Sequence, residues 1–339
     1  MIRSLRQTLV FLVLLALLLA TQLSLASQRS FWEDEAATAR LSTLSYSAII
    51  TERAQDNHPP LYWLLVSAWG WIFGQDELGL RSFSILCLVG VLALVYVLAG
   101  KFYSSRAAWL ASLLLVLSPF VLTYGHNARY YAFAACLSLL ALLGADHFLE
   151  DHKPWGLAGY TLTGISLIYT IYMGATVLLG INLWWLVRAR RGKYALRQIV
   201  AWLFAQGLIV LSYLPWLGTL AGATARNFDP AFSLASLPSA LAVRLGYLGF
   251  AYSVGEFFSP LHPLVWLGIG LSLLLLVSAL RRLDAPTGLL ASVLAVIISA
   301  RSSARSGMSS TRCCTAKRAS CMASVMLSPT FFLLICLTD

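Results

Sequence analysis

Apolar runs of about 15 to 20 residues, separated by short polar segments, recur along most of the chain. A soluble domain cannot bury so many helices that are apolar all around, because each would need its whole circumference covered. Runs of this length match a lipid bilayer, which takes about 20 helical residues to cross. The pattern predicts an all-α integral membrane protein with about nine transmembrane helices, at 9–26, 81–100, 107–123, 130–149, 155–170, 172–187, 198–221, 261–280 and 286–300.

The apolar segment 60–73 is too short for a full crossing and rich in tryptophan, so we expect a helix lying at the membrane surface. Basic residues test this choice, because Lys and Arg accumulate in cytoplasmic loops. With the N-terminus inside and 60–73 not crossing, the basic cluster at 188–193 falls inside, whereas a crossing would place it outside. Keeping that cluster inside also requires 155–187 to cross the membrane twice, so we divide it into two spans near 169–174.

Two long segments, 27–80 and 222–260, then face the non-cytoplasmic side, and the first of them forms a large outer loop with surface helices. They hold most of the acidic residues of the chain: Glu33, Asp34, Glu35, Glu52, Asp56, Asp76, Glu77, Asp229 and Glu256. This asymmetry points to chemistry at the non-cytoplasmic face.

Composition agrees with the membrane class and excludes several others. Charged residues make up 11% of the chain, against roughly 25% in soluble domains. The formal charge of +10 is explained by basic inner loops, so no nucleic-acid partner is expected. The six cysteines show no disulfide or zinc spacing. Without a Gly-rich phosphate loop or a His/Cys metal set, we expect no nucleotide-binding domain, metal or other cofactor.

The two ends of the chain differ in character. Residues 9–26 are long enough to remain a membrane anchor, although a cleaved signal peptide would have a similar basic start. After about residue 300 the sequence becomes rich in Ser, Arg and Cys. A disordered tail has such a composition, but the abrupt change favours a shifted reading frame or an artificial end. We therefore predict one membrane domain over 1–300 and assign no function to 301–339.

Three successive carboxylates, Glu33, Asp34 and Glu35, follow the first span. A carboxylate at this place is suited to accept a proton from an attacking hydroxyl or amine. A solvated helix start explains the same residues equally well, because acids favour the first turn of a helix.

Other polar residues mark the outer membrane boundary. His58 precedes two prolines and serves either as a phosphate contact or as part of a turn. Arg129, followed by Tyr130, lies against the positive-inside trend, and either pairs with a phosphate or extends toward lipid headgroups. Glu256 stands among aromatic residues, where it completes the acidic site or faces water.

In this order the segments resemble the GT-C superfamily of glycosyltransferases, specifically the dolichyl-phosphate-mannose–protein mannosyltransferase-like group, which includes the lipid A aminoarabinose transferases. The resemblance covers about residues 5–300. It rests on the first span and then Asp34-Glu35, His58-Pro59-Pro60-Leu61-Tyr62, Phe73-Gly74 with Arg81, Ala128-Arg129-Tyr130-Tyr131 and Gly255-Glu256.

The resemblance implies a membrane glycosyltransferase that moves a sugar, with inversion, from a polyprenyl or dolichyl phosphate donor to a lipid, glycan or protein acceptor. It implies Asp34 as the base, Glu35 as a residue that orients the acceptor or the base, and Arg129 as the site of the leaving phosphate. Further substrate-binding candidates are Glu33, His58, Tyr130 and Glu256. No metal is implied, and compact loops favour a prokaryotic inner membrane, with the active site on the non-cytoplasmic face.

The chain departs from this group in two respects. Asn127 stands where many relatives carry an acid, and relatives run well beyond 339 residues. A chain shortened by a shifted frame would lack part of the donor site and be inactive.

Two other functions stay open. A transporter or flippase for lipid-linked sugars is the second hypothesis, although transporters usually place charges at mid-membrane and show repeated halves. A non-catalytic membrane scaffold is the third, and it needs no acidic cluster.

Overall fold

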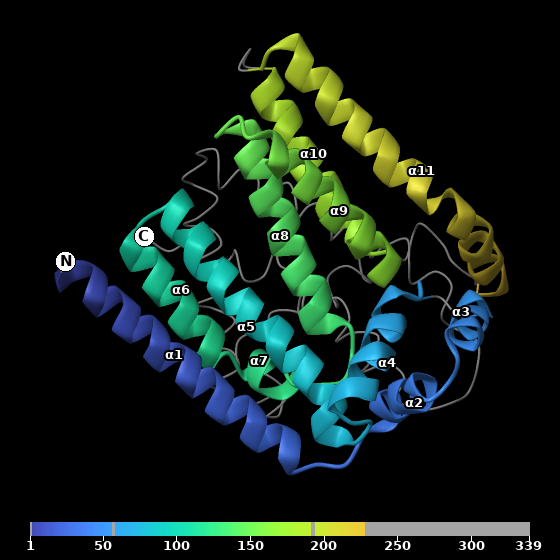
Figure 1. Cartoon of the computed structure of the whole chain (residues 1–339). Coiled ribbons are helices and arrows are strands. Elements are labelled where there is room, and N and C mark those ends of the chain that lie inside the picture. The colour runs from blue at the N-terminus through green and yellow to red at the C-terminus, as the bar shows by residue number, and fades with distance from the viewer. Residues whose placement is uncertain (1, 56–57, 191–193, 228–339) are drawn as a thin grey trace, which may run out of the picture.

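The computed structural model describes residues 2–55, 58–190 and 194–227, which form helices and contain no strand (Figure 1). The helices are α1 (Ile2–Ser27), α2 (Glu33–Ser42), α3 (Tyr46–Gln55), α4 (Leu61–Phe73), α5 (Glu77–Phe102), α6 (Ser105–Leu117), α7 (Pro119–Tyr124), α8 (Tyr131–Leu149), α9 (Pro154–Thr170), α10 (Gly174–Ala189) and α11 (Leu196–Asn227).

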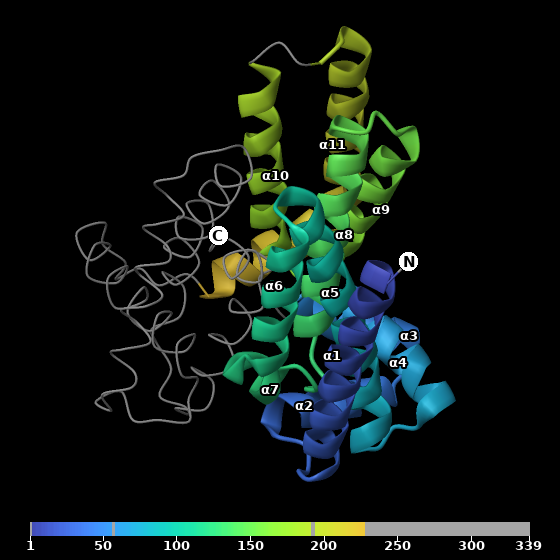
Figure 2. The ribbon, with the colours of Figure 1, turned by 90° about the vertical axis from the view of Figure 1, so that its left-hand side faces the viewer.

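The long helices run side by side in alternating directions, and the short helices α2, α3 and α4 gather at one end of the bundle (Figure 1). We call this the loop end. The C-terminus of α1 and the N-termini of α5 and α8 also lie there. The end of α8, the start of α9, the end of α10 and the start of α11 lie at the opposite end (Figure 2).

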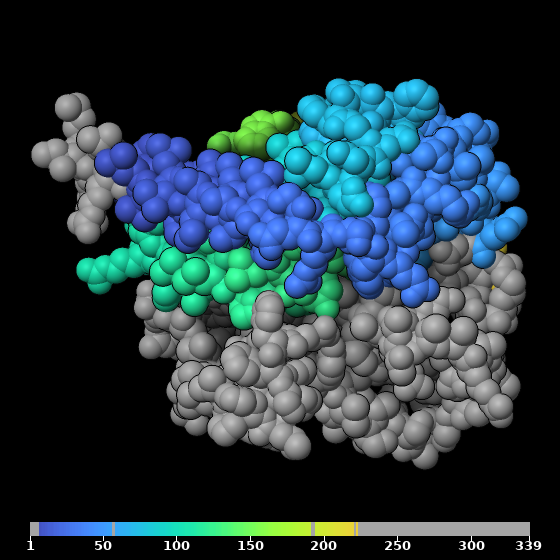
Figure 3. All heavy atoms as spheres, turned by 90° about the horizontal axis from the view of Figure 1, so that it is seen from below, coloured from blue at the N-terminus to red at the C-terminus, as the bar shows by residue number. Residues whose placement is uncertain are grey.

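Among the described residues, four helices are long and apolar enough to cross a membrane: Gln7–Ser27, Glu77–Phe102, Tyr131–Leu149 and Leu196–Thr219. Outward-facing residues on these helices are largely apolar, and Figure 3 shows α1 lying along the outside of one face. The predicted all-α membrane fold is therefore confirmed for the described residues. The spans predicted at 261–280 and 286–300 and the tail 301–339 lie outside those residues.

Local boundaries follow the sequence with one correction. The span predicted at 107–123 is two helices, because Pro119 lacks the N–H that would continue α6, and Ser118 adopts an extended ψ of 122°. The division predicted near 169–174 is confirmed: α9 ends at Thr170 and α10 begins at Gly174. Segment 60–73 contains the predicted short helix, α4, with 13 residues.

A tight turn joins α4 to α5 and sets the first residues of α5 in place. Gly74 has a φ of 103°, a backbone conformation that favours glycine. A Cβ on Gly79 would lie 2.2 Å from the Gly74 carbonyl oxygen, so glycine is needed there too. Asp76 caps α5 by accepting a hydrogen bond of 2.9 Å from the Gly79 N–H. The turn directs the start of α5 toward the loops at this end.

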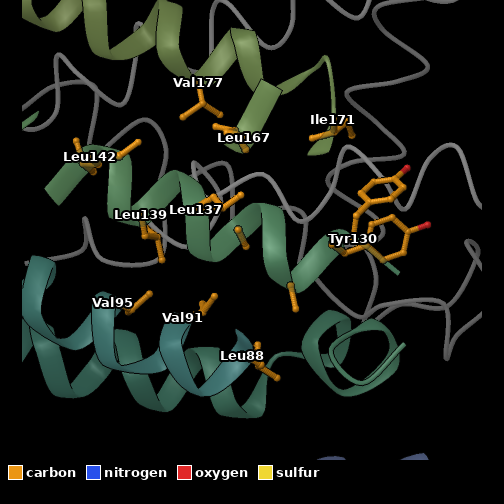
Figure 4. Packing of buried hydrophobic residues seen from close by; sticks show 14 of the residues in the cluster. Leu88, Val91, Val95, Tyr130, Leu137, Leu139, Leu142, Leu167, Ile171 and Val177 are labelled. Atoms are coloured by element: carbon orange, nitrogen blue, oxygen red, sulfur yellow. The ribbon is translucent and has the colours of Figure 1, made fainter. Parts of the chain in front are cut away.

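The core lies between α5, α8 and the pair α9–α10. Leu88, Val91 and Val95 of α5 face α8, while Leu167 and Val177 lie on its other side (Figure 4). Since α8 is thus covered from two directions, it is the central helix of the bundle.

Helices α8 and α9 approach each other through two glycines. A Cβ on Gly144 would lie 2.7 Å from the Tyr160 backbone nitrogen, and one on Gly156 would lie 2.7 Å from the Gly144 carbonyl oxygen. Small residues that let backbones touch are a common basis of helix packing in membranes.

Replacing Gly156 by leucine should therefore separate α8 from α9 and destabilise the protein by several kcal/mol, since overpacking alone costs about 1–3 kcal/mol and here the obstacle is backbone. Gly159, one turn later on α9, has nothing within 4 Å of a built Cβ and provides the matched control, Gly159→Leu. The midpoint of thermal unfolding in detergent is the measurement. Equal midpoints for the two variants would contradict this packing.

A polar network joins α9, α10 and α11 inside the bundle. The Asn182 amide nitrogen donates to Gln206 Oε1 at 3.0 Å, and the Trp202 Nε1–H donates to Asn182 Oδ1 at 2.9 Å. Tyr160 donates its hydroxyl to the same Gln206 oxygen at 3.2 Å. Interhelical hydrogen bonds of this kind hold membrane helices together.

Candidate functional site

The candidate site at the loop end is built around Arg81, which lies buried in the first turns of α5. Its Nε and Nη2 donate to the two carboxylate oxygens of Glu35, at 2.9 and 2.6 Å. Its remaining N–H groups donate to three backbone carbonyls, at 2.6 to 3.2 Å: Ala26, Arg29 and Ser30. All five guanidinium donors are therefore in use.

Glu35 is equally well satisfied. Its Oε1 also accepts a hydrogen bond of 2.8 Å from the Ala128 N–H, in the connection between α7 and α8. Its Oε2 also accepts one of 3.4 Å from the Trp32 N–H, which caps the start of α2. The side chain is 1% exposed. Glu35 thus orients the chain segments around it, and no face of its carboxylate is open to a substrate.

The neighbouring residue, Asp34, lies in a different environment. Its side chain is 23% exposed, and its Oδ2 stands 3.8 Å from Nη2 of Arg129 without accepting a hydrogen bond. Arg129 is 8% exposed, and its Nε has no hydrogen-bond partner among the described residues. Its Nη1 donates weakly to the Asp34 carbonyl oxygen, at 3.4 Å. This pair of charged groups therefore keeps unused hydrogen-bonding capacity.

An aromatic cluster of His58, Tyr62, Trp63 and Tyr130 lies beside this pair, with ring centroids 5.4 to 6.1 Å apart. His58 Nε2 is 3.2 Å from the Tyr130 hydroxyl, and the Arg129 guanidinium lies 5.2 Å from the Tyr130 ring centroid. The cluster joins the start of α4 to the start of α8, where Figure 4 shows Tyr130.

The structure therefore brings together four of the predicted site residues, namely Asp34, His58, Arg129 and Tyr130. Glu33 lies exposed at the first residue of α2, and Glu256 lies outside the described residues. Asn127 is buried, and its backbone carbonyl accepts a hydrogen bond of 2.6 Å from Ser84 Oγ.

His126, for which the sequence predicts no role, is buried near Arg81. Its Nδ1 is 3.2 Å from Oε1 of Gln22, and the Gln22 amide nitrogen donates to the Val121 carbonyl at 3.1 Å. The Gln22 oxygen thus faces the imidazole, so His126 Nδ1 carries the proton. Burial, assisted by the charge of Arg81, lowers the pKa of His126 to about 4. His126 is therefore neutral at pH 7.

A pH dependence of stability follows from this shift. Because the folded pKa of His126, about 4, lies below its ordinary value of 6.5, the unfolded chain takes up the proton first as the pH falls. Stability is lost between pH 6.5 and 4, by about 2 kcal/mol from pH 7 to pH 5. Thermal unfolding in detergent at these two pH values should show a smaller loss for His126→Gln than for the unchanged protein. Identical losses would contradict the assignment.

One group of metal-ligand residue types, Asp146, His147 and Asp151, lies at the opposite end of the bundle. The Lys101 ammonium is 2.5 Å from Asp146 Oδ2 and 2.8 Å from Asp151 Oδ2. Hydrogen bonds from Lys101 and His147 lower the pKa of Asp151 to about 2. Because Lys101 occupies the place that a cation would take, we interpret this group as a set of ion pairs joining α5 to α8.

Comparisons with known proteins concern the family and the fold. Residues 57–218 match the family model described as dolichyl-phosphate-mannose-protein mannosyltransferase. This range includes His58, Arg81 and Arg129, and begins after Asp34 and Glu35. No curated protein matches the chain.

Two solved structures share the fold. One is ArnT from Cupriavidus metallidurans in the apo state, with 14% identity and a TM-score of 0.57. The other is the same protein bound to undecaprenyl phosphate, with 16% identity and the same TM-score. Each match covers 96% of this chain and 59% of the ArnT chain, so this chain spans about three fifths of its structural relatives. The predicted resemblance to the GT-C superfamily is confirmed, and the chain has a GT-C-type fold.

Proposed function

We propose that this chain is a membrane glycosyltransferase that moves a sugar from a polyprenyl phosphate donor to an acceptor. The family match and the fold support a protein of this class, and ArnT with the same fold binds undecaprenyl phosphate. The observation that supports the proposal most is that Asp34 and Arg129 keep unpaired polar atoms, whereas the neighbouring Glu35 and Arg81 are fully hydrogen-bonded. The Asp34 side chain is partly exposed, but its Oδ2 is buried and unpaired, and it faces a buried arginine whose Nε is also unpaired.

In the proposed reaction, the Asp34 carboxylate takes the proton from an acceptor hydroxyl or amine. The acceptor atom forms a bond to the anomeric carbon as the bond from that carbon to the phosphate oxygen breaks, with inversion. The leaving polyprenyl phosphate keeps the electron pair, and the Arg129 guanidinium stabilises its charge. The long contact between Asp34 and Arg129 lets substrate groups enter without breaking a strong ion pair.

The surrounding residues fit supporting roles. His58 and Tyr130 border Arg129 and are suited to contact the phosphate or the sugar. Glu33, exposed beside Asp34, and Glu256 remain candidates for binding the acceptor. Glu35 is assigned a positioning role, because its oxygens are occupied.

We further propose that the loop end faces the non-cytoplasmic side of a prokaryotic inner membrane. Basic residues at the opposite end support this orientation through the positive-inside rule: Lys101, Arg106, Lys153, Arg188, Arg190 and Arg197. The apolar side chains of Trp71 and Phe73 on α4 are exposed at the loop end, as expected for a helix at the membrane interface.

A transporter is less well supported by the described residues. Transporters bind substrates near mid-membrane, commonly with broken spanning helices. Here the polar network between α9 and α11 is composed of neutral groups that bond to one another.

Binding of the lipid carrier tests the proposal. The purified protein in nanodiscs should bind undecaprenyl phosphate saturably and bind undecaprenol at least 100-fold more weakly, because charge-assisted hydrogen bonds to the phosphate each contribute about 1.5–3 kcal/mol. Equal binding of the two lipids would contradict a phosphate site.

A further inference from the structure

We infer that the Glu35–Arg81 pair is a positioning device that fixes Asp34 opposite Arg129. This inference rests on the proposed function and adds two positioning residues to its site. Neither residue is proposed to touch a substrate.

The hydrogen-bonding groups of Arg81 and Glu35 are all in use. The five N–H donors of Arg81 have five acceptors, and the two oxygens of Glu35 accept four hydrogen bonds. Asp34 Oδ2 and Arg129 Nε, by contrast, have none. Because buried polar groups are normally paired, this contrast separates residues that hold the site from residues that react.

The hydrogen bonds of Glu35 connect the chain segments that carry Asp34 and Arg129. Glu35 directly follows Asp34 in the first turn of α2, and its carboxylate accepts the Ala128 N–H at 2.8 Å. Ala128 directly precedes Arg129. One carboxylate therefore joins the backbone neighbours of both reactive residues, so a shift of Glu35 changes the distance between Asp34 and Arg129.

Helix α5 makes a second contact with the connection between α7 and α8. Ser84, one turn beyond Arg81, donates its hydroxyl to the Asn127 carbonyl at 2.6 Å, with a longer contact of 3.4 Å to the Arg129 carbonyl. The first turns of α5 thus hold both sides of the Asp34–Arg129 pair.

Arginine is the residue that this arrangement needs. Its planar fork meets the Glu35 carboxylate through two parallel bonds and still reaches the carbonyls at the end of α1. A lysine has three donors on one atom and cannot bridge the same groups. A buried ion pair is weak evidence of a stabilising role, because desolvation offsets the attraction. Orientation of neighbouring groups is a better account of its presence here.

The test is a double-mutant cycle on single-turnover sugar transfer, normalised to folded protein. Glu35→Gln keeps the shape, but its amide nitrogen, a donor, must face a donor of Arg81 together with the N–H of either Ala128 or Trp32. It should slow transfer by about 100-fold, the loss expected for a misplacement of about 1 Å. Ser84→Ala leaves the ion pair intact and should slow transfer by roughly 10-fold. Ser82→Ala is the matched control. It lies on the same helix, contacts Trp69 and Gly79, and should leave the rate unchanged.

The positioning role predicts that both losses largely disappear when Asp34 is already asparagine, because that protein no longer has a base to misplace. If Glu35→Gln and Ser84→Ala reduce the rate by the same factors in the Asp34→Asn protein, the positioning role is wrong while Asp34 still acts as the base. If Asp34→Asn alone leaves the rate unchanged, the proposed base is wrong, and the positioning role falls with it. Should Glu35→Gln not fold, Ser84→Ala decides the question.

Discussion

Asp34→Asn is expected to reduce sugar transfer by at least about 100-fold, because an amide does not accept the proton that the carboxylate takes and general-base catalysis contributes about 10²–10⁴-fold. Binding of undecaprenyl phosphate and the unfolding temperature should change little, since Asp34 Oδ2 makes no hydrogen bond in the structure. The measurement is the initial rate of transfer by purified protein.

Glu77→Gln is the matched control for this substitution. Glu77 is a carboxylate at the same end of the bundle, in the first turn of α5. It should leave the rate unchanged. An Asp34→Asn protein that kept more than half of the original rate would show that another group takes the proton.

The second large effect is expected at Arg129, where glutamine should weaken binding of undecaprenyl phosphate by at least about 100-fold. The reason is the loss of two charge-assisted hydrogen bonds, each contributing about 1.5–3 kcal/mol. Arg129→Lys keeps the positive charge but cannot make two parallel hydrogen bonds to the phosphate, so it should give an intermediate affinity for undecaprenyl phosphate. Equilibrium binding to protein in nanodiscs is the measurement.

Arg40→Gln provides the control for a general charge effect. Arg40 lies at the same end of the bundle, exposed, and pairs with Glu52 on α3. Its replacement should leave the Kd unchanged. Equal weakening by Arg40→Gln and Arg129→Gln would indicate diffuse attraction of the anionic lipid in place of a specific site.

Much of the fold was predictable from the sequence because each membrane span is a continuous run of apolar residues. Apolar runs identified α1, α5 and α8, and charge parity placed the α9–α10 break where Thr170 and Gly174 bound it. The division at Ser118 was missed, since apolar residues continue on both sides and hide the effect of one proline.

The site was predictable in part. Asp34, His58, Arg129 and Tyr130 were expected from their order along the chain, and they lie together. The connections among supporting residues were not predictable, because they join distant positions. Arg81 is 46 residues from Glu35, and Ala128 is 93 residues from it. No local pattern in the sequence indicates which arginine a buried carboxylate will meet.

The Glu35–Arg81 ion pair also changes the interpretation of the acidic cluster Glu33-Asp34-Glu35. Adjacent carboxylates look interchangeable in the sequence, yet helix geometry sends Asp34 and Glu35 in different directions from α2. One reaches a partly exposed surface beside Arg129, and the other is enclosed by Arg81 and backbone donors. We therefore propose a chemical role for Asp34 and a positioning role for Glu35.

The most direct test of the central claim is the fate of a labelled donor. The protein, reconstituted in liposomes, would be supplied with an undecaprenyl phosphate carrying a radiolabelled sugar, together with a membrane extract as the source of acceptor. The account predicts that free undecaprenyl phosphate and a labelled product appear in equal amounts, and that both are lost with Asp34→Asn. An intact donor, or equal release by the Asp34→Asn protein, would contradict it.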